Sequence, residues 1–122
     1  MGECTYRVKN LRTDKMLAHS VGWAATHFSR MKGLIGQASI AAGEGLYIPH
    51  CGSVHTFFMK FSIDVVFLDR ENRVKKIVEC LAPSRIAFGS IGTFGTLELA
   101  SKNVRKTSCG IGDQLYFQKN DV

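Results

Sequence analysis

Residues 51 to 69 contain most of the side chains in this sequence that could do chemistry. Cys51, His55 and Met59 recur every four residues and offer the soft sulfur and nitrogen donors that copper prefers. On a strand, however, four residues span about 13 Å at about 3.3 Å each, so the three side chains could not meet at one ion. The aromatic and β-branched content of the segment favours a strand. We therefore interpret Met59 as a core residue and Cys51 as a small buried side chain, and we predict no metal or other cofactor.

Two carboxylates, Asp64 and Glu98, stand out because each has large apolar residues on both sides. Two interpretations stay open: both face solvent from the outer sides of their strands, or both enter one polar pocket. A shared pocket needs a counter-charge, because an unpaired buried carboxylate is energetically costly. Arg30, Lys60 and Arg85 are the candidates for that charge.

These ionisable groups predict a binding site among aromatic strand residues. We expect a small ligand or a protein partner to bind at a pocket edged by Arg30, His55, Met59, Lys60, Asp64 and Glu98. An alternative is a hydrolase-like enzyme that uses His55 with Asp64 or Glu98 as a proton-transfer pair. Cys51 and Cys109 are interpreted as inert thiols, because a nucleophilic cysteine needs a histidine or cation beside it.

The positive charge of the chain permits binding to nucleic acid but does not predict it. The formal net charge is +6, yet the 16 lysines and arginines are scattered in or beside expected turns. No arginine-rich run or interleaved aromatic platform accompanies them, so a solvated surface explains them better. Nucleic-acid binding through a basic surface is kept as the second alternative.

The elements that must position the candidate residues are mostly strands. Alternation and turn residues predict strands near residues 4–9, 17–23, 46–48, 65–68, 74–81, 94–99 and 114–118, and one short helix near residues 26–35. The first two strands form a hairpin, and so do the fourth and fifth, which meet at a turn where Asn72 tolerates a left-handed backbone. Residues 83–93 are expected to be an irregular loop that Ile86 and Phe88 anchor against the core. Without a βα alternation, the chain is predicted to be a mainly β single domain over residues 1–122, a β-sandwich or a partly open barrel.

The segment before Asp69 has a regular apolar pattern. Every second residue from Phe57 to Phe67 is apolar, which is the pattern of a half-buried strand. We interpret Lys60, Phe61 and Ser62 as a break between two strands. That break would turn Asp64 toward the pocket.

The cysteines and the start of the chain bear on where the protein works. The four cysteines are widely separated, and none forms a CxxC pair, so free, reduced thiols are expected. The first residues lack the plan of a signal peptide, and no apolar run has the length of a transmembrane helix. As written, the sequence predicts a cytoplasmic protein, whereas a removed leader would indicate export.

Seven motifs, in order between about residues 24 and 117, resemble a known family. It comprises uncharacterised conserved bacterial and archaeal proteins called domain of unknown function 192. The motifs are Arg30-Met-Lys-Gly33-Leu34, Gly45-Leu46, Val54-His-Thr-Phe-Phe-Met-Lys-Phe61 with Ile63-Asp64-Val65, Phe67-Leu-Asp69, Pro83, Leu97-Glu98-Leu99 and Gly112-Asp113.

The resemblance implies a compact β-rich domain with a jelly-roll-like arrangement and no established activity. Some members of that family carry export signals or accompany pilus-assembly genes, which implies an envelope or secretion context by analogy. The sequence departs from the family at Ser62, where proline is usual, and at Lys102-Asn103, where Ala-Gly is common. Ser62 restores a backbone donor that proline lacks, so the break there is expected to be softer.

Overall fold

Short strands make up most of the structure. The computed structural model describes residues 5–24, 40–57 and 59–121. In chain order the described elements are β1 Thr5–Asn10, β2 Lys15–Trp23, β3 Glu44–Pro49, β4 Ser53–His55, β5 Ile63–Leu68, β6 Val74–Leu81, β7 Ile86–Phe88, β8 Gly95–Ala100, α2 Asn103–Lys106 and β9 Leu115–Lys119.

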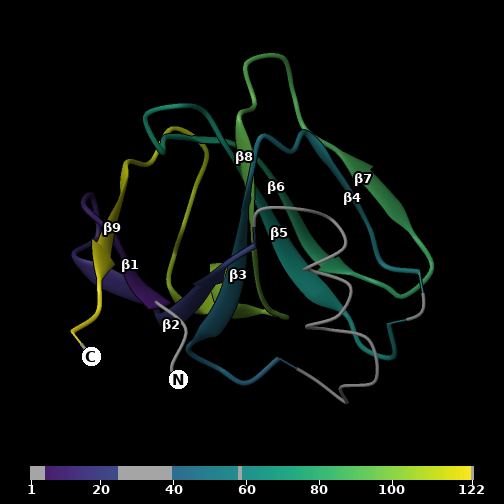
Figure 1. Ribbon diagram of the computed structural model, residues 1–122, viewed down its shortest axis with the longest axis horizontal. Helices are drawn as coiled ribbons and strands as arrows, with labels where there is room; N and C mark the ends of the chain where they lie inside the picture. The colour runs from purple at the N-terminus through teal and green to yellow at the C-terminus, as the bar shows by residue number, and fades with distance from the viewer. Residues whose placement is uncertain (1–4, 25–39, 58, 122) are drawn as a thin grey trace.

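Seven strands form one mixed sheet in the order β6-β5-β8-β3-β2-β1-β9, and β4 pairs with β7 in a separate two-stranded ribbon. Neighbours in the large sheet are antiparallel, apart from the parallel pair β2 and β3. An isolated bridge between Arg73 and Gln114 joins the segments that lead into β6 and β9. The sheet therefore curls until its two outer strands meet at one end, without closing into a barrel (Figure 1).

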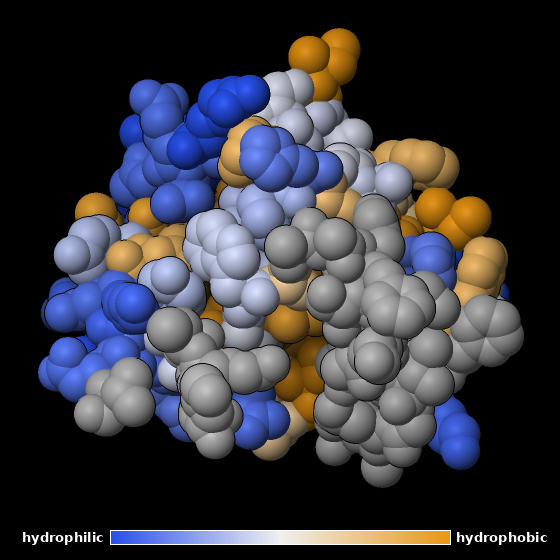
Figure 2. All heavy atoms as spheres, in the orientation of Figure 1, coloured by the Kyte–Doolittle hydropathy of each residue, from blue (hydrophilic) through white to orange (hydrophobic). Residues whose placement is uncertain are grey.

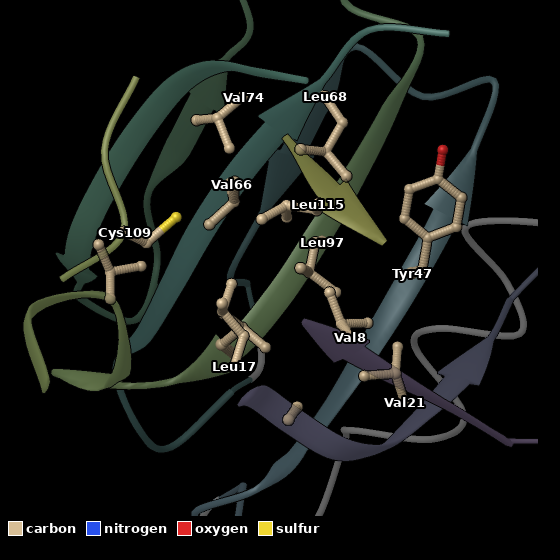
Figure 3. Packing of buried hydrophobic residues seen from close by; sticks show 13 residues of the cluster. Val8, Leu17, Val21, Tyr47, Val66, Leu68, Val74, Leu97, Cys109 and Leu115 are labelled. Atoms are coloured by element: carbon tan, nitrogen blue, oxygen red, sulfur yellow. The ribbon is translucent and has the colours of Figure 1, made fainter. Parts of the chain in front are cut away.

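The concave side of the curled sheet encloses the first core cluster. Side chains from strands at both ends of the sheet point toward one another there (Figure 3). Its buried members are Val8, Leu17, Ala18, Val21, Tyr47, Val66, Leu68, Val74, Leu97, Leu99, Val104, Cys109 and Leu115. Each large side chain that is fully buried in this way contributes about 1.5–3 kcal/mol, so the cluster stabilises the curled sheet.

A second core cluster lies on the other face of β5, under the ribbon of β4 and β7. Its buried members are Ala24, Ile48, Cys51, Val54, Met59, Ile63, Val65, Phe67, Leu81 and Ala87. Strand β5 is thus covered on both faces, and all six of its residues are buried. The prediction of a half-buried strand was wrong for this segment because the face expected to meet solvent, which carries Asp64, is turned into the first core cluster with Val66 and Leu68.

A close approach between β3 and β8 depends on a glycine. A side chain at Gly95 would collide with the ring and hydroxyl of Tyr47, which is only 2% exposed. The absence of a side chain at Gly95 lets the tyrosine ring lie flat against β8 in the first core cluster.

The mainly β prediction is confirmed, and each predicted strand has a counterpart whose ends fall within two residues of those expected. Both predicted hairpins are present, and Asn72 has the left-handed backbone expected of it, with φ of 64°. The break at residues 60–62 is also confirmed, since β5 begins at Ile63. The helix predicted near residues 26–35 lies outside the described residues.

Three local features differ from the predictions. Residues 57, 59 and 60 lie outside any strand although the apolar alternation extends to Phe57, because the chain turns after β4. The segment predicted as an irregular loop contains β7, which pairs with β4. The polar stretch after Leu99 forms the short helix α2, for which the sequence offered no clear start signal.

Candidate functional site

Asp64 is the second residue of β5 and is fully buried. Its carboxylate accepts hydrogen bonds from the backbone amides of Cys80 at 2.8 Å, Lys102 at 3.2 Å and Val104 at 2.8 Å. A buried carboxylate is stable in such a place when donors satisfy its oxygens. Asp64 therefore joins β6, the β8–α2 connection and the first turn of α2.

Two of the residues held by Asp64 have unusual backbone conformations. Cys80 has φ of 52° and Lys102 has φ of 74°, a region that residues other than glycine rarely adopt. Such a conformation persists only where the surrounding structure enforces it. The Asp64 carboxylate supplies that restraint by bonding the amide of each residue.

Glu98 lies on β8, next to β5, and is also fully buried. In the antiparallel register Asp64 lies opposite Leu99, whereas Glu98 lies opposite Val65. Residues opposite one another share a face of a sheet, and adjacent residues alternate between faces. Asp64 consequently faces the first core cluster with Leu99, and Glu98 faces the second core cluster with Val65.

The structure therefore contradicts both interpretations of the two carboxylates. They are not solvated, because both are fully buried. They do not enter one pocket either, because the register places them on opposite faces of the sheet. Leu97 and Leu99 lie in the first core cluster and Glu98 faces the other way, as strand alternation requires, whereas the pairing of β5 with β8 could not be read from either strand alone.

His55 ends β4 and is half-buried, and its ring stacks on Phe57 with a centroid distance of 5.0 Å and an interplanar angle of 27°. Met59 is buried in the second core cluster together with Cys51, as the sequence predicted. Lys60 is exposed. Arg30, one of the three candidates for the counter-charge, lies outside the described residues.

The ribbon of β4 and β7 has one buried and one open face. Val54 and Ala87, which are paired in the register, enter the second core cluster. Their neighbours on β7, Ile86 and Phe88, point the other way and are 52% and 64% exposed. The prediction that these two side chains anchor the loop against the core was wrong, because Ala87 between them occupies that position.

The open face continues beyond the ribbon. Phe57 is 40% exposed, and Ile91, in the connection between β7 and β8, is 98% exposed. Hydrophobic atoms gather at the tip of that connection and along the side where β7 lies (Figure 2). We call the group Phe57, Ile86, Phe88 and Ile91 the apolar ribbon face; exposed large apolar side chains that gather on one side of a molecule are characteristic of interaction sites.

One end of the ribbon is fixed by Thr56, which follows His55 and is fully buried. Its hydroxyl donates to the carbonyl oxygen of Ala82 at 2.6 Å and accepts from the backbone amide of Arg85 at 2.9 Å. Its own amide donates to the carbonyl of Arg85 at 2.9 Å. The apolar ribbon face is therefore carried on a rigid support.

A polar network that the sequence did not reveal lies at the opposite end of the sheet. Asp113 accepts hydrogen bonds from Arg12 Nε at 2.6 Å, Asn10 Nδ2 at 2.8 Å and the Gly110 amide at 2.7 Å. The bond from Arg12 and those from Asn10 and Gly110 lower the pKa of Asp113 to about 2. Burial raises the pKa of the nearby Cys109 thiol to about 11. This network ties the β1–β2 turn to the segment before β9.

Neither a metal site nor a membrane span is recognised in the part of the chain that the structure describes. Those residues include no group of three or more histidine, cysteine or acidic side chains that could hold an ion. They also include no helix with the length and hydrophobicity to cross a bilayer.

Two solved structures have closely similar folds. One is a protein from Sinorhizobium meliloti named a "putative transcription regulator", with a TM-score of 0.79 and 18% identity over 95% of this chain and 94% of that one. The other is a protein of unknown function from Novosphingobium aromaticivorans, with a TM-score of 0.77 and 17% identity over 92% of this chain and 83% of that one. At these identities the likeness shows the fold alone. Among curated proteins no sequence matches the chain.

The sequence profile of one family matches residues 8–117, which is most of the chain and includes the strands that hold Asp64, Glu98 and His55. This match confirms the resemblance drawn from the seven motifs. The protein is a small, mainly β member of the uncharacterised family DUF192, "Uncharacterized ACR".

Proposed function

We propose that this protein is a binding domain that engages a protein partner through the apolar ribbon face beside His55. The observation that carries the proposal is the exposure of Ile86 and Phe88, at 52% and 64%, on a ribbon whose other face is in the core. Large apolar side chains that a fold presents in this way raise the free energy of the isolated protein in water, and a partner that covers them removes that penalty.

The surroundings of the face indicate the chemistry of the partner. Lys60 and Arg85, at the end of the ribbon near His55, are exposed cations. Lys76 donates from Nζ to the carbonyl oxygen of Phe88 at 2.7 Å, which places a third cation beside the apolar side chains. An apolar segment flanked by carboxylates therefore fits this surface best, since charges at the rim steer association and set the register of binding.

Rigidity also supports the proposal. Thr56, which follows β4, bonds Arg85, which precedes β7, through its backbone and its hydroxyl, so this end of the ribbon is already ordered before binding. A preorganised surface loses less conformational entropy when a partner docks. His55, stacked on Phe57, would contribute its ring edge to the contact.

Site-specific photo-crosslinking in cells tests the proposal. Benzoylphenylalanine at position 88 should yield a crosslinked partner, whereas the same residue at Tyr116, which is 52% exposed on a distant strand, should not. The partner identified at position 88 is then purified and titrated against the wild type and two double variants. Ile86→Ser with Phe88→Ser should weaken binding at least tenfold, and the matched control Leu11→Ser with Tyr116→Ser should change it less than twofold.

Two outcomes would overturn the proposal. The first is equal crosslinking at positions 88 and 116, or equal affinity of the two double variants for the partner. The second is concentration-dependent self-association in analytical ultracentrifugation that only Ile86→Ser with Phe88→Ser abolishes, because the face would then join two copies of this chain.

A further inference from the structure

A cleft of about 540 Å³ opens between the end of β6 and α2, on a part of the molecule separate from the apolar ribbon face. Two short segments line it. Glu79 and Cys80 come from β6, Lys102 immediately precedes α2, and Arg105 and Lys106 lie in α2. All five residues are exposed, so the cleft is accessible from solvent.

The charges in the cleft are mostly positive. Among the described residues that line it, three cations face one carboxylate, and Glu79 Oε1 lies 3.5 Å from Arg105 Nε. Within the described residues no carboxylate forms an ion pair with Lys102 or Lys106. The two lysines therefore give the cleft an excess of positive charge. Arg105 forms an ion pair with Glu79.

The backbone that forms the cleft is preorganised by a single buried group. Asp64 bonds the amide of Cys80 in one wall and the amides of Lys102 and Val104 in the other. Cys80 and Lys102 both have positive φ angles that such a restraint maintains. Strain of this kind concentrates at binding sites, where the fold holds residues in a conformation that they would not adopt by themselves.

We propose that this cleft binds a small anion that carries a phosphate group. The guanidinium of Arg105 can present two parallel N–H donors to phosphate oxygens, and Lys102 and Lys106 add mobile point charges on either side. A phosphate monoester is a dianion near neutral pH and would neutralise the excess charge of the two lysines. Asp64 acts here as a positioning residue, because it bonds the walls of the cleft from beneath and is fully buried.

The test is a titration of isotope-labelled protein with phenyl phosphate in low-salt buffer free of phosphate, followed by amide NMR. Saturable shifts should concentrate at Cys80, Lys102 and Val104. Lys102→Gln with Lys106→Gln should weaken binding at least tenfold, while Lys119→Gln, which removes an exposed lysine from β9, should change it less than twofold. Glu79→Gln should strengthen binding two- to fivefold, since it removes the negative charge that Glu79 brings to the cleft.

Each contrary result is distinct. Shifts spread over many exposed lysines, with Lys119→Gln as damaging as the double variant, would mean that the anion responds only to net charge. Weaker binding in Glu79→Gln would mean that the ion pair with Arg105 builds the site, contrary to the proposal. The amide spectrum of each variant reports whether it is folded, so a loss of binding through unfolding is recognised directly.

Discussion

Asp64 and Glu98 lie on adjacent strands and face opposite sides of the sheet, because Asp64 pairs with Leu99 and Glu98 pairs with Val65. The two carboxylates therefore face different core clusters. A substitution at one of them leaves the surroundings of the other carboxylate in place. Asp64 supports the β6–α2 cleft through backbone amides. Glu98 lies on the side that the ribbon of β4 and β7 covers.

Replacing Asp64 by asparagine should destabilise the protein by about 2–4 kcal/mol, because hydrogen bonds to a buried charged acceptor contribute about 1.5–3 kcal/mol each. The asparagine amide group would also point a donor at one of the three backbone amides. Urea denaturation followed by circular dichroism measures the change. The matched control, Asp14→Asn, alters an aspartate whose side chain is 83% exposed and should stay within about 0.5 kcal/mol of wild type. Equal effects of the two substitutions would contradict the structural role of Asp64.

The Asp113 network predicts a specific loss of stability in acid. The folded-state pKa of Asp113 is about 2, below its ordinary value of 3.8. Its contribution to the free energy of unfolding is therefore complete above about pH 4. It is lost as the pH falls toward 2, when the carboxylate accepts a proton. The contribution at neutral pH is about 1–2 kcal/mol, reduced by solvent screening at Arg12.

Unfolding free energies measured by urea from pH 2 to pH 7 test this expectation. The unfolding free energy of Asp113→Asn should fall less steeply between pH 4 and pH 2 than that of the wild type. Asp121→Asn, which changes an exposed aspartate, should retain the wild-type slope. A decline of the same steepness in Asp113→Asn and the wild type would show that the network does not govern acid stability.

The contact between Gly95 and Tyr47 predicts the cost of adding one methyl group. Gly95→Ala should lower stability by about 1–3 kcal/mol, because the new Cβ would force the buried tyrosine ring or β8 to move. Gly52→Ala is a matched control, since no atom lies within 4 Å of the Cβ position there. Thermal unfolding of both variants gives the comparison. A wild-type melting temperature for Gly95→Ala would mean that Tyr47 does not pack as described.

The three described cysteines should differ widely in reactivity. Cys80 is exposed, whereas Cys51 and Cys109 are buried, and the raised pKa of Cys109 further reduces its thiolate fraction. Iodoacetamide at pH 8 should therefore label Cys80 at least tenfold faster than either of the others in the native protein, as followed by peptide mass spectrometry. In urea the three rates should converge. Native labelling of Cys109 as fast as that of Cys80 would place Cys109 outside the core.

The parts of the fold that follow from local sequence were predictable. Asn72 identifies a turn by its tolerance of a left-handed backbone, and the β-branched runs on either side form the hairpin of β5 and β6. The break at residues 60–62 was likewise visible in the polar interruption at Lys60 and Ser62. In each case the determining interactions lie within a few residues along the chain.

The site was less predictable because its contacts join distant segments. Asp64 bonds the amide of Val104, forty residues away, and a backbone amide leaves no mark on the sequence. The exposure of Ile86 and Phe88 depends on which face of β7 meets β4, and a three-residue strand has too little alternation to reveal this. The sequence identifies Asp64 as unusual, but only the structure shows which backbone amides it bonds.

The strand order has a consequence for how the protein is made. β9 covers the outer edge of β1, although β9 is the last strand in the chain and β1 is the first. Until a ribosome has released residues 115 to 119, the β1–β2 hairpin therefore presents an unpaired backbone edge to its surroundings. Exposed edges of this kind recruit strands from other chains. Nascent chains stalled before β9 should thus be the form of this protein that most needs a chaperone.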